Sequence, residues 1–122
     1  MGGFFLDSIF RLIAKSAKSE HRANDAATWL RVDGKTSRFT FVNEVGNRAR
    51  PLLVYSYEIG GETFYGSATG SPIGLEQVNQ VAQTVDGVGI VHVRYDPSDL
   101  GSSRLLNQDN PNIPFEIDHA AY

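Results

Sequence analysis

Apolar residues recur with helical spacing near the start of the chain and alternate with polar residues further along. Over residues 3–22 seven apolar positions fall within an arc of roughly 160° when successive residues are placed about 100° apart, whereas Phe4 projects to the polar side. This arc holds Phe5, Leu6, Ile9, Phe10, Leu12, Ile13 and Ala17. The opposite side holds Asp7, Arg11, Lys15 and Lys18. The pattern predicts an N-terminal amphipathic helix, which Asn24-Asp25 can end.

Beyond residue 28 the pattern changes to the two-residue period of strands. The strand-like segments are residues 36–45, 52–59, 62–68, 89–95 and 103–106. The turn-forming runs are Asp33-Gly34, Gly46-Asn47-Arg48, Gly60-Gly61 and Asp96-Pro97-Ser98-Asp99. Pro51 is expected at the beginning of a strand, because a proline inside a sheet removes a ladder hydrogen bond.

One predicted helix interrupts the strands over residues 74–85. Its apolar positions at helical spacing are Leu75, Val78, Val81, Ala82 and Val85. These elements predict an α+β fold, with a small, curved, mostly antiparallel sheet or partly open barrel. The predicted divisions are a helix and connector at 1–28, a β domain at 29–106 and a polar C-terminal tail at 107–122. Phe115 and Ile117 can add an edge strand from that tail; otherwise its end is frayed.

Size and composition limit the class of protein. A chain of 122 residues can bury one hydrophobic core. Because it has no cysteine, disulfides, cysteine-bound zinc, iron–sulfur clusters and thiol catalysis are excluded. Many secreted bacterial-type domains also lack cysteine, so this feature does not fix the compartment. No apolar run reaches the roughly 18 residues that a membrane span needs, and the N-terminal segment lacks the basic region of a signal peptide. The expected location is the cytoplasm or a membrane surface.

Charge is distributed unevenly along the chain. The net charge is −3, which argues against general nucleic-acid binding. Residues 1–40 carry a net charge of +3 and residues 41–122 a net charge of −6. A basic segment beside an acidic body predicts either an anionic partner for the segment or docking of the segment on its own body.

Several short motifs occur together between residues 29 and 106. They are Trp29, Tyr55-Ser56-Tyr57, Gly60-Gly61, Phe64-Tyr65, Arg94-Tyr95-Asp96-Pro97 and Arg104-Leu105-Leu106. On these motifs the chain resembles the domain of unknown function 3592 family. The resemblance implies a small β domain with a helix between its third and fourth strands, often beside transmembrane helices, and it supplies no catalytic residues. The chain departs from that pattern, since its N-terminal helix is amphipathic, whereas many members have a membrane-spanning helix.

The N-terminal helix is the main candidate binding site. Its candidate residues are Phe5, Leu6, Ile9, Phe10, Arg11, Leu12, Ile13, Lys15 and Lys18. An apolar face with cations above it suits an anionic membrane surface. The same face could instead cover the sheet or pair with a second copy.

Other residues offer weaker chemistry. The aromatic residues that could line a ligand groove, but more often form core pairs, are Trp29, Phe39, Phe41, Tyr55, Tyr57, Phe64, Tyr65 and Tyr95. Residues 66–74 could cradle an anion, but they lack the spacing of a phosphate loop and are expected to form an ordinary loop. No histidine has a partner at metal-ligand spacing, and an acid–base pair of His92 with Asp96 or Asp99 would lack a nucleophile. Asp96 is expected to cap a turn.

The sequence therefore predicts a non-enzymatic accessory or interaction module, without cofactor or metal. Its expected partner is a membrane surface or a protein, bound through the N-terminal helix, and not a nucleic acid. Two alternatives stay open. One is a small-ligand or anion-binding domain that uses the aromatic residues and the loop at 66–74. The other is a self-assembling structural protein whose helix pairs between subunits.

Overall fold

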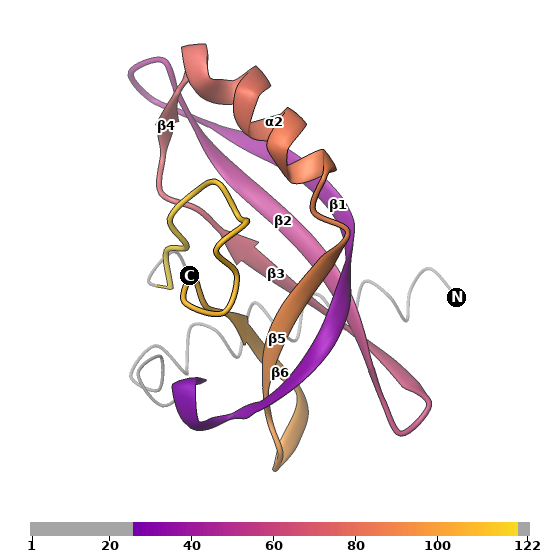
Figure 1. Cartoon of the computed structure of the whole chain (residues 1–122). Coiled ribbons are helices and arrows are strands. Elements are labelled where there is room, and N and C mark those ends of the chain that lie inside the picture. The colour runs from indigo at the N-terminus through magenta and orange to yellow at the C-terminus, as the bar shows by residue number, and fades with distance from the viewer. Residues whose placement is uncertain (1–25, 120–122) are drawn as a thin grey trace, which may run out of the picture.

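A long hairpin forms the middle of the sheet in the computed structural model, which describes residues 26–119 (Figure 1). Its strands are β1 (Leu30–Glu44) and β2 (Arg48–Ile59). On one side β2 pairs with β3 (Glu62–Thr69), and at its start with the short β4 (Ile73–Gly74). On the other side β1 pairs with β5 (Ile90–Asp96), which pairs with β6 (Asp99–Leu105). The strand order is β3-β2-β1-β5-β6, and every neighbouring pair is antiparallel.

The sheet curves until its two outer strands, β3 and β6, approach each other. Two tyrosines of β2 reach across the interior to β6. The hydroxyl of Tyr55 lies 2.8 Å from that of Ser103, and the hydroxyl of Tyr57 donates a 2.8 Å hydrogen bond to the carbonyl of Leu100. Gly66 on β3 leaves room for this crossing, because a Cβ there would lie 2.4 Å from the Tyr55 ring. The predicted curved, mostly antiparallel sheet is confirmed as a nearly closed barrel.

The barrel interior is filled by alternate residues of the strands. Leu53, Tyr55 and Tyr57 share the inner face of β2, as the two-residue period predicted, and all are at most 2 % exposed. The predicted helix is also confirmed, as a 3₁₀ turn (Leu75–Gln77) that continues into α2 (Val78–Asp86). Figure 1 shows α2 lying across the upper part of β1 and β2. Val81 and Val85 on this helix join the core.

The predicted turn at Asp33-Gly34 is wrong, because β1 runs straight through both residues. Gly34 pairs with Tyr57 on one side and with Val91 on the other. A Cβ on Gly34 would lie 2.5 Å from the carbonyl oxygen of Ser56 and 2.9 Å from a Val93 methyl group. This glycine therefore serves the close approach of neighbouring strands and not a change of chain direction.

Pro51 lies inside β2 and not at its beginning, so the prediction for this residue is also wrong. The carbonyl of Pro51 accepts a 2.8 Å hydrogen bond from the Gly70 amide, just beyond the end of β3. In an antiparallel strand the N–H and C=O of one residue point to the same side. The position that lacks an N–H therefore faces the gap between β3 and β4, where no ladder bond is lost.

Three other predicted turns are confirmed. Gly46 and Asn47 have φ values of 78° and 57°, which suit the tight connection between β1 and β2. Gly60 and Gly61 have φ values of 61° and 83° and join β2 to β3. Asp96 caps the β5–β6 turn, since its Oδ1 accepts a 2.9 Å hydrogen bond from the Ser98 amide.

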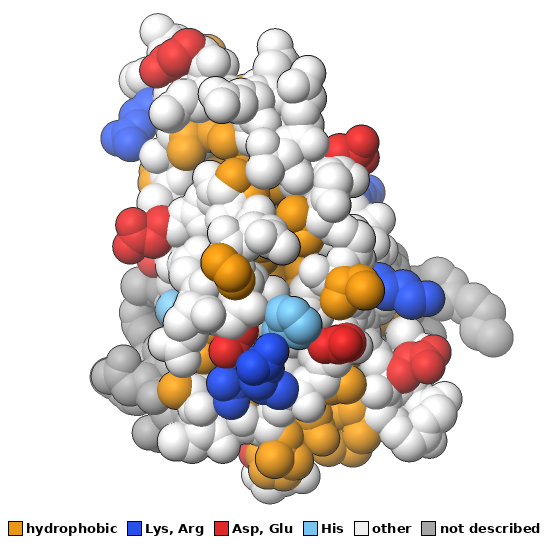
Figure 2. Space-filling view, in the orientation of Figure 1, with side chains coloured by type: hydrophobic (Ala, Val, Ile, Leu, Met, Phe, Trp, Pro, Cys, Tyr) orange, Lys and Arg blue, Asp and Glu red, His pale blue; other side chains and the backbone are white. Residues whose placement is uncertain are grey.

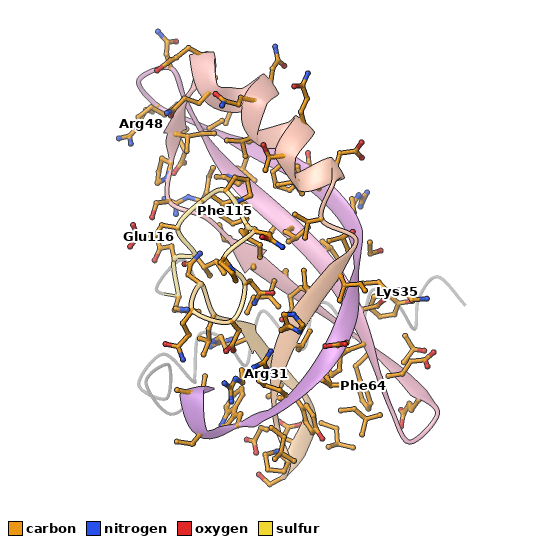
Figure 3. All side chains as sticks on the ribbon, viewed as in Figure 1. Arg31, Lys35, Arg48, Phe64, Phe115 and Glu116 are labelled. Carbon is orange, nitrogen blue, oxygen red and sulfur yellow. The ribbon has the colours of Figure 1, made fainter. Side chains whose placement is uncertain are left out.

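The segment after β6 packs against the barrel and supplies core side chains. Ile113, Phe115 and Ile117 are each at most 8 % exposed, and Figure 3 shows Phe115 beneath the C-terminal loop, facing the sheet. Two asparagine side chains hold the segment. Asn110 accepts from the amide of His92 and donates to its carbonyl, whereas Asn107 donates to the carbonyl of Phe115 and accepts from the amide of Ile117. At His92 the side-chain amide of Asn110 thus takes the place of a neighbouring strand. The proposed edge strand is reduced to one bridge between Ile117 and Gly70.

Candidate functional site

The nine predicted binding residues between Phe5 and Lys18 lie outside the described residues, so their role stays a prediction. What the structure describes is the point where this segment joins the barrel. Ala26 is 0 % exposed and Trp29 is 7 % exposed, and both pack with Leu106 in a small cluster separate from the main core. The segment is therefore connected to a buried and well-packed turn.

Arg94 on β5 uses its three side-chain nitrogens to hold both this turn and Asp109. Nη1 donates to the carbonyls of Ala27 and Trp29 at 3.1 and 2.9 Å. Nε and Nη2 donate to the two carboxylate oxygens of Asp109 at 2.8 and 3.1 Å. The hydrogen bonds from Arg94 hold the pKa of the Asp109 carboxyl below its usual value. Arg94 thus bonds both the turn at Ala27 and Trp29, where the N-terminal segment joins the barrel, and the segment after β6.

Six of the eight aromatic residues proposed for a ligand groove pack against other aromatic rings, and Trp29 belongs to the separate small cluster. Tyr57 stacks on Phe64 and on Tyr95, with ring centroids 5.6 and 6.4 Å apart. Phe39 meets Phe41 edge to face at 5.0 Å and stacks on Phe115 at 6.1 Å. These rings form core pairs, the arrangement typical of aromatic residues on strands.

The polar candidates are placed apart from one another. His92 lies beside Asp33, with Nδ1 2.8 Å from Oδ1 on the outer surface, and not beside Asp96 or Asp99. Residues 66–69 belong to β3, and a Cβ at Gly70 would collide with the Phe115 ring, so this stretch is packed backbone and not an open cradle. No group of three His, Asp or Glu side chains that could hold a metal ion occurs within residues 26–119.

A small charged cavity lies where the final residues meet the β3–β6 seam. It is lined in part by Arg104, Asp118 and His119 and holds about 20 Å³, which is room for a single water molecule. Burial lowers the pKa of both Arg104 and His119. A cavity of this size suits a structural water and excludes a larger ligand.

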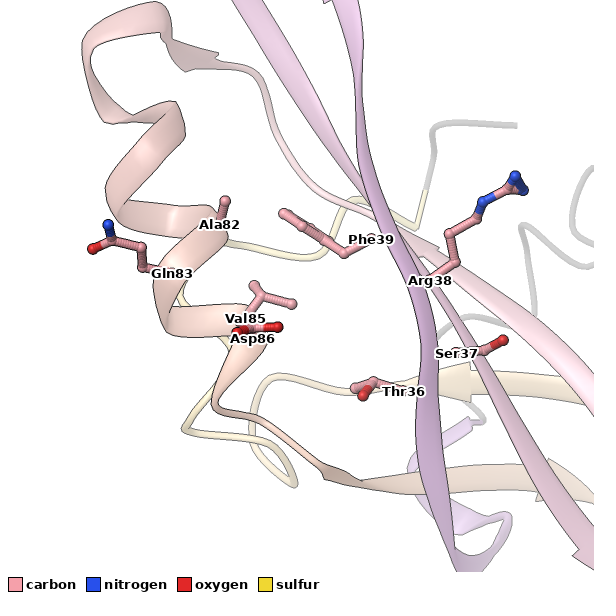
Figure 4. A pocket seen from close by; sticks show the side chains of 8 residues that line it. All are labelled: Thr36, Ser37, Arg38, Phe39, Ala82, Gln83, Val85 and Asp86. Atoms are coloured by element: carbon pink, nitrogen blue, oxygen red, sulfur yellow. The ribbon is translucent and has the colours of Figure 1, made fainter.

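A larger groove separates α2 from the second half of β1. It holds about 480 Å³ and is lined by Thr36, Ser37, Arg38 and Phe39 of β1 and by Ala82, Gln83, Val85 and Asp86 of α2. In Figure 4 the side chains of Phe39 and Val85 point into the space between strand and helix, whereas Arg38 points away from the helix. The groove thus has an apolar floor and charged residues at its margins.

The β1 side of this groove is an unpaired strand edge. β5 pairs with β1 only from Leu30 to Lys35, and the register then shifts between Thr36 and Arg38, which leaves Ser37 without a partner on β2. Such a bulge bends a strand away from its neighbour. Just beyond the paired region, Thr36 still contacts the connection before β5, through hydrogen bonds from its amide to the carbonyl of Gly89 at 3.3 Å and from its hydroxyl to the carbonyl of Val88 at 3.0 Å.

The register shows which backbone groups of β1 face the groove. Phe41 lies opposite Pro51, whose carbonyl points away from β1 toward Gly70. In an antiparallel pair, two opposite residues either bond each other or both point their N–H and C=O groups away from the partner strand. Because the Pro51 carbonyl points away from β1, the N–H and C=O groups of Phe41 point away from β2. By alternation the same holds for Phe39 and Asn43. None of the hydrogen bonds found within residues 26–119 reaches the N–H or C=O groups of these three residues.

Comparison with known proteins identifies no relative. No family model, no curated protein and no solved structure matches the chain. The resemblance to the domain of unknown function 3592 family therefore stays a prediction. On the face shown in Figure 2, acidic, basic and hydrophobic side chains are interspersed. Among the described helices none is both long and apolar enough to cross a membrane.

Sequence reasoning missed the groove between β1 and α2. The alternation over residues 36–45 correctly indicated a strand, but alternation does not reveal which edges of a strand are paired. Strand length is informative only once the structure is known, since β1 has 15 residues and β5 has 7, so part of β1 lacks a partner on that side.

Proposed function

We propose that this chain is a non-enzymatic interaction module that attaches to anionic membrane surfaces through its N-terminal segment. The observation that carries the proposal is the joining point of that segment. Arg94 holds the carbonyls of Ala27 and Trp29, and the adjoining cluster is buried. Because the joining point is buried and hydrogen-bonded to β5, binding of the N-terminal segment to a membrane would hold the whole barrel at that surface.

The amphipathic pattern supports a membrane surface as the partner. Phe5, Ile9 and Ile13 represent the apolar face, and Lys15 and Lys18 lie on the other side. Aromatic and aliphatic side chains enter the headgroup boundary, while each cation near an anionic surface adds roughly 1 kcal/mol of attraction. The N-terminal segment at residues 1–25 carries a net charge of +1 and residues 26–122 carry a net charge of −4, so anionic lipid attracts the segment and not the body.

Vesicle co-sedimentation of the full chain tests the proposal. We expect binding to anionic vesicles, weaker binding to neutral vesicles, and weakening as salt rises. Replacement of both Lys15→Glu and Lys18→Glu should reduce binding by at least about tenfold, because two attractive charges become repulsive. The matched control is Lys35→Glu, which makes the same kind of change at an exposed position of β1 and should leave binding close to that of the unaltered chain.

Apolar-face variants and molecular mass complete the experiment. Ile9→Asp with Ile13→Asp should abolish binding if the apolar face enters the lipid. If the full chain does not sediment with either type of vesicle, the proposal is wrong. If these two substitutions instead halve the mass of the protein in solution, the segment is a subunit interface and the self-assembling alternative is correct.

A further inference from the structure

The open edge of β1 offers main-chain hydrogen bonds that no described residue uses. Phe39, Phe41 and Asn43 point their N–H and C=O groups away from β2, over a length of about five residues or roughly 17 Å. An unpaired edge of this kind is a template for another strand. The sequence around it, Arg38-Phe39-Thr40-Phe41-Val42, contains neither proline nor glycine to discourage pairing.

α2 limits what can occupy this edge. The groove between β1 and α2 has the edge as one wall and Ala82, Val85 and Asp86 on the other. A single extended segment fits between a strand edge and a helix, with its main chain on the strand and alternate side chains directed toward the helix. A second folded copy fits this space less well than a single segment does. Its own α2 lies beside its β1 edge and would have to enter the same groove.

We propose that the groove between β1 and α2 binds an extended peptide segment of a partner protein, which adds a strand antiparallel to β1. The bound strand continues the line of β5, which already pairs antiparallel with Leu30–Lys35 on this edge. Its inward side chains are apolar, because they meet Phe39, Ala82 and Val85. The groove therefore selects peptides with apolar residues at every second position.

The charged residues at the margins of the groove define which charged residues the bound peptide should carry. Arg38 points outward from β1, and Asp86 lies at the end of α2. Neither forms an ion pair with another residue in the part of the chain that the structure describes. Opposite charges across neighbouring strands stabilise a pair, so an outward acidic residue of the peptide beside Arg38 and a basic residue near Asp86 are favoured.

The probe is an acetylated and amidated peptide with the sequence Ile-Val-His-Val-Arg-Tyr-Asp, which is that of β5. This sequence alternates apolar and polar residues and pairs with the same edge of β1 in the fold. Titration of the isotopically labelled full chain should shift the amide resonances of Phe39, Phe41 and Asn43. The matched control peptide carries N-methyl groups on the amides that would face β1, so it keeps every side chain but cannot form the main-chain bonds. We expect it to bind at least about tenfold more weakly, since two or more hydrogen bonds are lost.

Hydrogen exchange provides a second measurement on the same samples. In the full chain without peptide, the amides of Phe39, Phe41 and Asn43 should exchange rapidly, and those of Thr40 and Val42, which face β2, should exchange slowly. Addition of the peptide should slow the first group and leave the second unchanged. Slow exchange of the first group without peptide would overturn the proposal, because the edge would already be occupied.

Variants on α2 separate binding in the groove from binding elsewhere. Ala82→Arg places a long side chain in the groove and should abolish peptide binding, while Gln80→Arg makes a similar change on an exposed part of the helix and should retain it. Equal binding of the N-methylated peptide, or binding unaffected by Ala82→Arg, overturns the proposal, as does failure of the peptide to bind at millimolar concentration. Protection of the edge amides that grows with protein concentration, together with a doubled mass, would assign the edge to a second copy instead.

Discussion

The guanidinium of Arg94 and the carboxylate of Asp109 meet through two hydrogen bonds, from Nε to Oδ2 at 2.8 Å and from Nη2 to Oδ1 at 3.1 Å. Both side chains are largely buried, at 16 % and 6 % exposed. The pair joins β5 to the segment after β6, and the remaining nitrogen of the guanidinium holds the turn at Trp29. One ion pair thus connects the middle of the barrel to both flanking segments.

This geometry predicts how acid affects stability. Because the Arg94 hydrogen bonds lower the pKa of Asp109 in the folded protein, the unfolded chain binds the proton more readily. The stabilisation is complete above the usual carboxyl pKa of about 4 and is lost as pH falls through the lower folded value. Denaturant unfolding of Asp109→Asn should show a loss of about 3 kcal/mol at pH 7, because the charge on Arg94 is left without its partner.

The control for this prediction is Asp33→Asn. Asp33 also contacts a basic side chain, His92, but its own side chain is 73 % exposed. We expect its replacement to change the free energy of unfolding by no more than about 0.5 kcal/mol. A loss at Asp109→Asn that is the same at pH 7 and at pH 2 would contradict the ion-pair explanation.

Asn110 should be sensitive to the loss of its donor group. Its side chain, in a residue 4 % exposed, donates to the carbonyls of His92 and Leu106 and accepts from the amide of His92. Asn110→Asp keeps the shape but replaces the donor with a charged acceptor facing two carbonyl oxygens. We expect a loss of at least about 2 kcal/mol in denaturant unfolding. Asn112→Asp, on an exposed residue of the same segment, is the matched change and should have little effect.

Gly34 should tolerate no side chain. Gly34→Ala would bring a methyl group to 2.5 Å from the carbonyl oxygen of Ser56 on the neighbouring strand, so the backbone would have to move. A loss of about 1–3 kcal/mol is typical of such overpacking. At Gly89, which lies on the connection between α2 and β5, a Cβ meets nothing within 4 Å. Gly89→Ala should therefore be neutral or stabilise by up to about 1 kcal/mol, and a comparable loss at both positions would contradict the packing argument.

Gly34 also illustrates what local sequence patterns can and cannot predict. Asp33-Gly34 has the composition of a turn, and Gly60-Gly61 and Gly46-Asn47 have it too. The latter two are turns because their own backbone conformations require positive φ. A glycine is required at position 34 for a different reason, because atoms of Ser56 and Val93 lie close to it once the barrel has formed. A local pattern contains no information about such neighbours.

The same limit applies to the segment after β6 and to the candidate site. Residues 107–112 are polar, and two of them, Asn107 and Asn110, act as backbone substitutes inside the fold. The strand at β1 and the helix at α2 were each predictable from periodicity. The groove between them was not, because it depends on where β5 separates from β1.

The burial of Tyr55 predicts the response to alkali. Tyr55 is fully buried, and burial raises the pKa of its hydroxyl from 10.0 to about 12. The pKa of Tyr57 is raised for the same reason. Between pH 10 and pH 12 the unfolded chain therefore loses protons that the folded chain keeps. Since the folded state then binds more protons than the unfolded state, stability falls as pH rises through this range.

Ultraviolet absorbance at high pH, measured alongside circular dichroism, checks this prediction. Two tyrosines should ionise only as the circular dichroism signal of the fold is lost. Tyr55→Phe removes one of these groups, so its stability should fall less steeply between pH 10 and pH 12. At pH 7 the same variant should lose only about 1 kcal/mol, because the Ser103 hydroxyl loses one hydrogen-bond partner. Ser103→Ala should cost a similar amount, and the double variant less than the sum, since both changes break the same bond. Ionisation of every tyrosine near pH 10 without unfolding would show that Tyr55 is open to water and that the barrel does not close as described.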